Sequence, residues 1–298
     1  MPATQIGFVG LGIMGGPMAE NLLDAGYDVV GHNRSPEPVE ALVAQGGEAA
    51  DSPAEVARRA EVTITCVPDT EAVESVVRGP DGILGGLEAG DTYVDMSTIS
   101  PPATEELAAD VAETGATMLD APISGGEQGA IDGTLSIMIG GDPDVLAERR
   151  DVFEVLGETI THCGPNGAGQ TAKACNQIIV AAQAVAVSEA LLLAEQAGAD
   201  LEAVVDAVSG GAAGCWALDN RALRMLDGDF EPGFFASYQY KDLRIATEAG
   251  ETFGAPLPQT AVTHELYKSM ETTGKGYDDF AGVLQVLESL AGQEARRD

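Results

Sequence analysis

The stretch IGFVGLGIMGG, residues 6–16, decides the fold of this chain. An apolar run typical of a buried strand leads into glycines spaced as GxGxxG, and residues 17–25 follow with the apolar spacing of a helix. In a strand-to-helix turn, such glycines let backbone N–H groups approach a pyrophosphate and let the helix pack closely on the strand. A glycine-rich turn without a ligand is the alternative. The position of the motif between strand and helix predicts a dinucleotide-binding turn made by Gly10, Leu11, Gly12, Ile13, Met14 and Gly15.

Short apolar and β-branched runs alternate with helical stretches through the first half of the chain. Seven of them predict strands: TQIGFVG, YDVVGHN, EVTITCV, DTYVDMS, ATMLDAP, LSIMIGG and ETITHCG. Strands that alternate with helices form a parallel sheet with helices on both faces. We therefore expect an α/β dinucleotide-binding domain over residues 1–164.

The second half of the chain has a different pattern. Strand signals almost vanish after residue 164, and an alanine- and leucine-rich run predicts one long helix over about 170–197. Further helices are expected near 200–208, 215–226, 240–253 and 257–272. The turn-forming stretch GPNGAGQ lies at the change of pattern. We expect an all-α second domain over residues 165–298.

The end of the second expected strand indicates which dinucleotide binds. An NAD site usually has an acidic residue there to bind the ribose 2′-hydroxyl, whereas a 2′-phosphate needs a cation. This strand ends with His32, Asn33, Arg34 and Ser35, and Arg34 is one of only 11 arginines in a chain with 48 acidic residues. The sequence therefore favours NADP(H), with Asn33, Arg34 and Ser35 at the site. NAD(H) stays open, with Arg34 as a surface residue.

The long helix carries polar residues on one side. Gln170, Lys173, Asn176 and Gln177 are spaced to share a face of a helix that is otherwise small and apolar. A lysine removed from water can exchange a proton near neutral pH, because burial disfavours the charged ammonium. Lys173 is therefore the candidate catalytic residue, and Asn176 or Gln177 could orient it or the reacting oxygen. The alternative is a solvated polar face with the lysine stem lying along the surface.

Two further segments have chemistry that suits a substrate or cofactor. Asp120 to Gly126, DAPISGG, follows an expected strand and precedes a helix, so the Ser124 hydroxyl and the N–H groups of Gly125 and Gly126 could bind a carboxylate. An ordinary turn is the alternative. Lys241 begins an expected helix in the second half. It could reach the cofactor or pair with a neighbouring acid.

The chain is strongly acidic, with 15 basic and 48 acidic residues and a net charge of −33. This charge repels phosphate, so nucleic-acid and anionic-membrane partners are disfavoured. It suits a cytoplasmic protein in concentrated salt, where screening reduces self-repulsion. The four cysteines and three histidines lack the spacing of a disulfide framework or a metal site. No stretch is expected to span a bilayer, because Gln183, Ser188 and Glu189 interrupt the longest apolar run.

Four ordered motifs together resemble the β-hydroxyacid dehydrogenase family over essentially the entire chain. GFVGLGIMGGPMAENL is similar to its N-terminal signature, DAPISGGEQGAIDGTLSIMIGG to its substrate-binding segment, GAGQTAKACNQ to its catalytic segment and YKDLRIA to its cofactor-closing segment. Many family members have asparagine four residues after the lysine, where this chain has Gln177, with Asn176 at three. The tartronate semialdehyde reductase branch resembles this arrangement.

The resemblance implies a Rossmann-type domain followed by an all-helical domain through which homodimers or homotetramers form. It implies that Lys173 is the general acid in aldehyde reduction and the general base in alcohol oxidation. Ser124, Gly125 and Gly126 would hold the carboxylate of a small substrate, with Asn176 and Gln177 beside it. The implied cofactor contacts beyond the glycine-rich turn and Arg34 are Val67, Pro68, Ser97, Thr98 and Lys241.

These observations predict an NADP(H)-dependent oxidoreductase that interconverts a small β-hydroxy acid and its semialdehyde, most similar to 2-hydroxy-3-oxopropionate (tartronate semialdehyde) reductase. Two alternatives stay open: an NAD-dependent 3-hydroxyisobutyrate dehydrogenase and a non-catalytic dinucleotide-binding interaction module. Lys173 argues against the last, because a module that only binds needs no proton donor.

Overall fold

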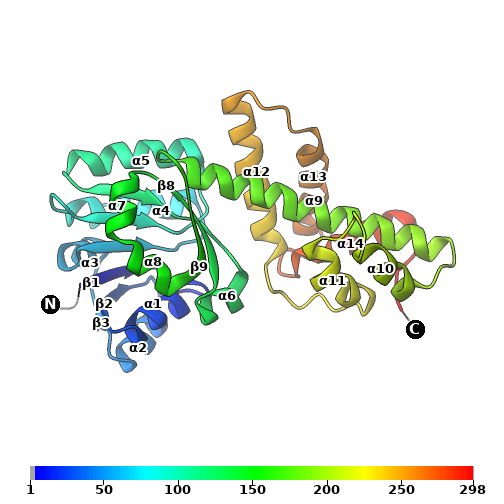
Figure 1. Cartoon of the computed structure of the whole chain (residues 1–298), viewed down its shortest axis with the longest axis horizontal. Coiled ribbons are helices and arrows are strands. Elements are labelled where there is room, and N and C mark those ends of the chain that lie inside the picture. The colour runs from blue at the N-terminus through cyan, green and yellow to red at the C-terminus, as the bar shows by residue number, and fades with distance from the viewer. Residues whose placement is uncertain (1–3, 298) are drawn as a thin grey trace. The chain divides into compact units, whose positions relative to one another are not determined.

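A computed structural model describes residues 4–297 of the chain (Figure 1). The backbone divides into two compact units, and the division falls between Lys173 and Ala174. It lies within the first turns of a long helix, nine residues beyond the 164/165 boundary expected from the change of sequence pattern.

Unit 1 is built on one sheet with the strand order β3-β2-β1-β4-β5-β6-β8-β7, and β9 pairs with β8. The strands are β1 (Gln5–Val9), β2 (Asp28–His32), β3 (Glu48–Ala49), β4 (Val62–Thr65), β5 (Thr92–Asp95), β6 (Thr117–Asp120), β7 (Ile123–Ser124), β8 (Leu135–Gly140) and β9 (Gly157–Gly164). The order from β3 to β6 is that of a doubly wound dinucleotide-binding sheet. The strand order reverses between β1 and β4: β2 and β3 follow on one side of β1, and β4, β5 and β6 follow on the other. Ligands bind at this point in such sheets.

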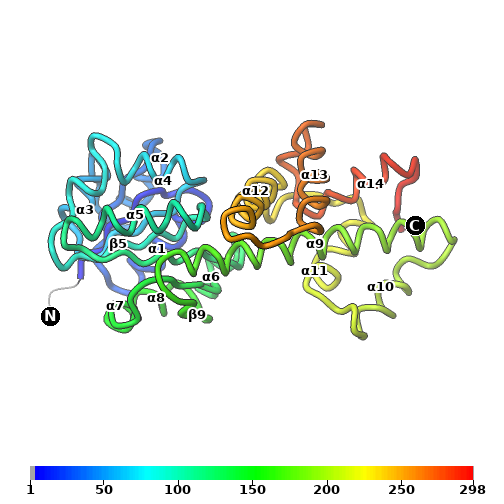
Figure 2. The backbone as a smooth tube through the Cα atoms, turned by 90° about the horizontal axis from the view of Figure 1, so that it is seen from above, coloured from blue at the N-terminus to red at the C-terminus, as the bar shows by residue number. Residues whose placement is uncertain are grey.

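The strands alternate their side chains between two apolar layers. Phe8 and Val94 belong to one buried cluster, whereas their chain neighbours Val9 and Tyr93 belong to another. Since successive side chains of a strand point to opposite faces, each layer covers one face of the sheet. Figure 2 shows α3, α4 and α5 on one side of unit 1 and α6, α7 and α8 on the other. The helices are α1 (Gly15–Asp24), α2 (Pro36–Ala44), α3 (Pro53–Arg59), α4 (Thr70–Arg78), η1 (Ile83–Gly85), α5 (Pro101–Glu113), α6 (Gly126–Asp132), α7 (Pro143–Glu148) and α8 (Arg150–Leu156).

Unit 2 is built of helices joined by loops, with an isolated antiparallel bridge between Phe235 and Asp279. Its helices are α9 (Ala168–Gln196), which begins in unit 1, α10 (Leu201–Ser209), α11 (Trp216–Leu226), α12 (Ala236–Phe253), α13 (Pro258–Thr272), η2 (Phe280–Gly282) and α14 (Val283–Ala291). Two apolar clusters hold them together, one around Leu191 and Met225 and the other around Ala184 and Tyr267. The fold class is therefore the expected one, an α/β dinucleotide-binding domain followed by an all-α domain.

Three expectations about the fold are wrong in detail. The sheet is not wholly parallel, because β8 runs antiparallel to both β6 and β7. The two-residue strands β3 and β7 were not expected, since runs this short carry no period that a sequence can display. Helix α12 begins at Ala236, so Lys241 lies in its second turn instead of at its start.

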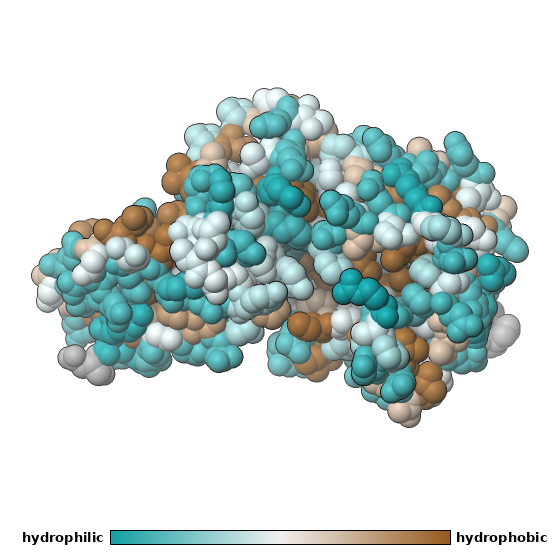
Figure 3. Space-filling model, turned by 180° about the vertical axis from the view of Figure 1, so that it is seen from behind, coloured by the Kyte–Doolittle hydropathy of each residue, from teal (hydrophilic) through white to brown (hydrophobic). Residues whose placement is uncertain are grey.

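Helix α9 corrects the expectation that no stretch could span a bilayer. By length and composition it is long and apolar enough to cross a membrane. Half of its most apolar 18-residue window is buried inside the structure, as in the central helix of a helical domain. One such helix is weak support for a membrane span. Hydrophilic residues cover most of the face of the molecule drawn in Figure 3, in keeping with the acidic composition.

Candidate active site

The glycine-rich turn between β1 and α1 has the geometry that close backbone approach requires. Gly10 has φ +97°, and a Cβ atom on it would lie 2.3 Å from the carbonyl oxygen of Cys66. A Cβ on Gly15 would lie 1.9 Å from the carbonyl oxygen of Gly10, so only glycine lets α1 pack this close to the turn. A Cβ on Gly12, by contrast, would meet nothing within 4 Å. The turn is thus crowded toward the protein and open at Gly12, which fits a pyrophosphate lying against its backbone at the start of α1.

The end of β2 supports this turn directly. Asn33 accepts a hydrogen bond at Oδ1 from the backbone N–H of Leu11, 3.1 Å away, and its Nδ2 donates to the hydroxyl of Ser35 at 3.0 Å. Asn33 therefore ties the glycine-rich turn to the residues that precede α2. The Arg34 side chain between them is exposed, and no hydrogen bond or ion pair holds it within residues 4–297. A cation in this place is available to an anionic ligand.

The ends of β4 and β5 meet through Ser97. Its hydroxyl accepts a hydrogen bond from the N–H of Val67 at 3.0 Å, and its own N–H donates to Asp95 Oδ1 at 3.1 Å. Two candidate cofactor segments, 67–68 and 97–98, are thereby held together at the carboxyl edge of the sheet, beside the point where the strand order reverses.

Asp95 is a buried acid that the sequence did not single out. Its Oδ1 accepts from the hydroxyl of Thr65 at 2.7 Å, whereas its Oδ2 has no hydrogen-bond partner among the described residues. Burial raises the pKa of Asp95 to about 6, although the bonds from Ser97 and Thr65 act in the opposite direction. An aspartate at the end of the strand DTYVDMS belongs to no recognisable motif. Only the structure shows that Asp95 holds the loop of Ser97.

The DAPISGG segment contains a turn with two successive glycines of positive φ. Ser124 ends β7 and is half-buried, and both Gly125 (φ +144°) and Gly126 (φ +66°) have backbone conformations that other residues rarely adopt. Successive N–H groups in such a turn form a concave site for an anion. The geometry fits the expected carboxylate-binding turn.

The candidate catalytic lysine lies in the second turn of α9. Lys173 is only 6% exposed, and Gln170, one turn before it, is 1% exposed. The polar face expected from the sequence is therefore buried instead of solvated at these two positions. Burial of a lysine removes the alternative of a stem lying along an open surface.

The other two residues of the expected polar face, Asn176 and Gln177, lie in unit 2 and differ in burial and in bonding partners. Gln177 is 3% exposed, and its Nε2 donates to Asp242 Oδ2 of α12 at 2.6 Å. Asn176 is half-buried and donates from Nδ2 to the Oε1 of Gln177 at 2.8 Å. Lys241 Nζ lies 3.1 Å from the other oxygen of Asp242, so Asp242 is the neighbouring acid of Lys241 and also connects it to Gln177 of α9. A lysine followed by an acid is a common pair in sequences, so it did not indicate that Asp242 also bonds to Gln177.

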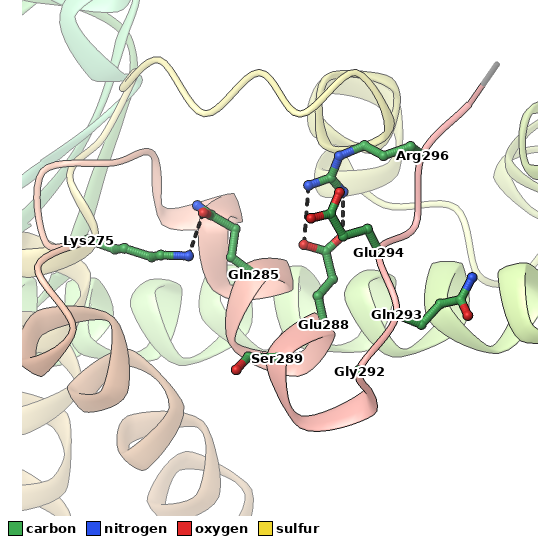
Figure 4. A pocket seen from close by; sticks show the side chains of 8 residues that line it. All are labelled: Lys275, Gln285, Glu288, Ser289, Gly292, Gln293, Glu294 and Arg296. Atoms are coloured by element: carbon green, nitrogen blue, oxygen red, sulfur yellow. Dashed lines mark hydrogen bonds and ion pairs between the residues drawn. The ribbon is translucent and has the colours of Figure 1, made fainter.

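One pocket of about 370 Å³ lies elsewhere in unit 2, between α14 and the segment that follows it (Figure 4). Its cations are already paired: Lys275 donates to Gln285 at 2.6 Å, and Arg296 forms an ion pair with Glu288. None of the candidate site residues lines this pocket. Within residues 4–297, no group of three or more histidine, cysteine or acidic side chains is arranged to hold a metal ion.

Comparisons with known proteins agree with the fold. Residues 5–164 match the NAD-binding domain of 6-phosphogluconate dehydrogenase, and residues 167–287 match the NAD-binding domain of NADP-dependent 3-hydroxyisobutyrate dehydrogenase. The fold and the glycine-rich turn thus define a nicotinamide-dinucleotide oxidoreductase.

Three relatives bear on the family and the substrate class. The chain is 42% identical over 291 residues to 2-hydroxy-3-oxopropionate reductase of Escherichia coli, covering 97% of this chain and 99% of the relative. It is 36% identical over 296 residues to the NAD-dependent L-serine dehydrogenase of Pseudomonas aeruginosa, with 97% and 99% covered. The structure of Mycobacterium tuberculosis 3-hydroxyisobutyrate dehydrogenase with L-serine matches with a TM-score of 0.90 and 34% identity, over 96% of this chain and 99% of that one.

The chain belongs to the β-hydroxyacid dehydrogenase family. It is an oxidoreductase that acts on β-hydroxy acids with a nicotinamide cofactor.

The raised pKa of Asp95 makes a prediction about stability. The folded protein holds this proton more tightly than the unfolded chain, whose aspartates have the ordinary value of 3.8, so stability contributed by Asp95 is lost as pH rises from about 4 to 6. The Asp95→Asn variant cannot ionise. Its free energy of unfolding relative to the wild type should therefore increase by about 2–3 kcal/mol between pH 4 and pH 7.

Denaturant unfolding at both pH values, in molar salt and without cofactor, measures this difference. The exposed variant Asp51→Asn reports the general effect of removing one negative charge from this acidic chain. A difference between Asp95→Asn and wild type that is equal at pH 4 and pH 7 would show that Asp95 is not the buried titrating group.

Proposed function

We propose that this protein is an NADP(H)-dependent reductase of a small semialdehyde, with 2-hydroxy-3-oxopropionate (tartronate semialdehyde) as its substrate. The observation that carries the proposal is the burial of Lys173 in the second turn of α9, the helix that follows the dinucleotide-binding sheet directly. A buried lysine in this position suits proton transfer to a carbonyl oxygen. The 42% identity to the Escherichia coli reductase supports the choice of substrate.

The residues of the chain divide the work as follows. The bound nicotinamide supplies or accepts the hydride. Lys173 gives a proton from Nζ to the carbonyl oxygen during reduction and removes it from the hydroxyl during oxidation. The Ser124 hydroxyl and the N–H groups of Gly125 and Gly126 bind the substrate carboxylate. Because the amide of Gln177 is committed to Asp242, we assign the substrate contact to Asn176 and a supporting role to Gln177.

The proposed cofactor contacts come from several loops. The glycine-rich turn binds the pyrophosphate, and Arg34 binds the 2′-phosphate with Asn33 and Ser35 beside it. Arg34 supports NADP(H) because it is exposed next to a side chain that contacts the turn. The remaining proposed contacts are Val67, Pro68, Ser97, Thr98 and Lys241.

The proposal extends to assembly and setting. We take residues 1–164 as the NADP-binding domain and 165–298 as the domain that completes the substrate site and forms a homodimer or homotetramer. Exposed apolar side chains on the second domain support association, among them Ile179, Leu193, Val262 and Leu290. A cytoplasm of high salt content suits a net charge of −33.

An NAD-dependent 3-hydroxyisobutyrate dehydrogenase is the second candidate. The similarity of the fold to the Mycobacterium tuberculosis enzyme of that name favours it, with its TM-score of 0.90 at 34% identity. In this case Arg34 would play no part in binding.

A panel of initial rates distinguishes these candidates. Tartronate semialdehyde, methylmalonate semialdehyde, succinic semialdehyde and glyoxylate are each reduced with NADPH and with NADH in molar salt. We expect the highest kcat/KM for tartronate semialdehyde with NADPH. A preference for methylmalonate semialdehyde with NADH would establish the second candidate. Stabilisation by dinucleotide without turnover of any substrate would indicate a non-catalytic binding module.

Replacing the lysine tests its role in proton transfer. Lys173→Ala should lower kcat by about 10²–10⁴-fold, because the carbonyl oxygen loses its proton donor. The dissociation constant for NADPH, measured by fluorescence titration, should stay close to the wild-type value. Lys268→Ala is the control, since that lysine is exposed and pairs with Glu265. A Lys173→Ala enzyme with near-normal kcat would remove this residue from the mechanism.

Arg34→Ala tests the choice of cofactor. The KM for NADPH should rise by at least about tenfold, while the KM for NADH should change little, because only the 2′-phosphate loses a charged partner. Arg58→Ala provides a matched control, as another exposed arginine of the same unit. Equal increases in both KM values would contradict the assignment of Arg34 to the 2′-phosphate.

A further inference from the structure

The side chain of Gln170 joins the helix of the catalytic lysine to the loop after β5. Its Nε2 donates to the carbonyl oxygen of Ser97 at 2.8 Å, and its Oε1 accepts from the N–H of Ile99 at 3.1 Å. One buried amide thus satisfies a backbone acceptor and a backbone donor on either side of Thr98. No shorter polar side chain has both groups at this reach.

The loop that Gln170 holds is itself connected to the other cofactor loop. Ser97 accepts from the N–H of Val67 and donates its own N–H to Asp95, so the N–H and C=O groups of Ser97 and the N–H of Ile99 are all hydrogen-bonded. Displacing this loop would break these hydrogen bonds. A buried donor or acceptor that is left unpaired costs free energy. A shift of α9 would therefore be transmitted to the loop through Gln170.

The start of α9 is fixed on the sheet by a second, independent contact. Asp120, fully buried at the end of β6, accepts from the N–H of Gly167 at 2.9 Å and from the N–H of Gln170 at 3.0 Å. A carboxylate at a helix start is stabilised by these unpaired N–H groups. A Cβ on Gly169 would lie 2.8 Å from Asp120 Oδ2, so this close approach depends on glycine. Gln170 is therefore held by its backbone to the sheet and by its side chain to the loop.

Gln170 and Lys173 are three positions apart in α9 and so lie on the same side of the helix. We propose that Gln170 is a positioning residue for hydride transfer: it fixes the loop of Ser97 and Thr98, which we assigned above to the cofactor, relative to the ammonium group of Lys173. This inference rests on the proposed function for the roles of that loop and of Lys173. Gln170 itself contacts neither the reacting atoms nor the proton.

A purely structural role for Gln170 gives different expectations from a positioning role. If the amide only stabilised unit 1, its loss would lower the melting temperature and leave the kcat of the folded enzyme unchanged. If it sets the relative position of two reacting groups, its loss should lower kcat while substrate and cofactor KM values change little, because orientation is needed for the chemical step.

The first measurement uses the ligand-free protein. Gln170→Met keeps the length of the side chain and removes both hydrogen bonds, so amide hydrogen exchange of the 97–101 segment should be accelerated by about tenfold or more. Gln170→Glu keeps an acceptor for Ile99 and loses the donor to Ser97, and should be intermediate. Gln196→Met, at the exposed end of the same helix, should exchange at the wild-type rate in this segment. Unchanged exchange in both Gln170 variants would overturn the proposal.

The second measurement uses the holoenzyme with NADPH and with NADPH deuterated at the transferred position. For Gln170→Met we expect kcat to fall on the order of 10²-fold, with KM values within about threefold of wild type and a larger primary isotope effect on kcat. If this variant does not fold, Gln170→Glu takes its place, with a smaller fall in kcat. Faster exchange in the loop with unchanged kcat and isotope effect would make Gln170 a structural residue and refute the positioning role.

The two measurements separate this inference from the proposed function. Should Lys173→Ala keep its activity, the role of the lysine fails, whereas the exchange of the 97–101 segment in ligand-free Gln170 variants still tests the link between helix and loop. If Lys173→Ala is inactive and Gln170→Met behaves as wild type in both measurements, the proposed function stands and the positioning role is refuted.

Discussion

A buried carboxylate, Asp120, joins the sheet of unit 1 to helix α9, and the rest of the site depends on this contact. Burial raises the pKa of Asp120, although the N–H groups of Gly167 and Gln170 donate to it and favour its charged form. A lone charge in an apolar interior would be very costly, so the carboxylate needs the start of a helix beside it. Gly169 of GPNGAGQ lets the chain come this close, since a Cβ there would crowd Asp120. The same strand end leads into the turn of Ser124, so one electrostatic constraint fixes where the helix of Lys173 begins and where the turn proposed to bind a carboxylate begins.

The sequence predicted those features that depend on local sterics or on a regular period. All seven expected strands are present, and the turn at Gly10 and Gly15 has the crowding that the glycine motif requires, because these are properties of neighbouring residues. The antiparallel β8 and the roles of Gln170 and Asp242 could not be predicted. The direction of β8 depends on the two-residue strand β7 beside it, which carries no periodic pattern. The roles of Gln170 and Asp242 depend on partners about 70 residues away along the chain, such as Ser97 for Gln170, and one sequence does not show which distant polar groups meet. Arg34 stood out by its position at the end of the second strand in a chain with few cations, and Lys173 by its place on the polar face of an otherwise apolar helix.

The large excess of acid gives the positions of the cations particular weight. Most described arginines lie within ion pairs, including Arg59 with Glu48, Arg78 with Asp110 and Arg224 with Asp229. Exposed pairs of this kind contribute little free energy each, and concentrated salt weakens them further. Arg34 is exposed beside Asn33 and outside any such pair among the described residues. A phosphate group can carry two negative charges and can form two hydrogen bonds with a guanidinium group, so it binds Arg34 more strongly than a single surface carboxylate does. This is the physical basis for linking Arg34 to a 2′-phosphate.

The arrangement of Asn176 and Gln177 gives a physical reason for the order of these two residues after the lysine. Glutamine has one more methylene than asparagine, and Gln177 uses that reach to bind Asp242 in α12 while Asn176 donates to its carbonyl oxygen. Asp242 in turn lies against Lys241, so the amide pair extends from α9 to a second cation. An asparagine in place of Gln177 would be about 1.5 Å too short to keep the 2.6 Å bond to Asp242 without a shift of the helices. The two amides therefore differ in position: Gln177 holds helix to helix, and the half-buried Asn176 is the residue for which we propose the substrate contact.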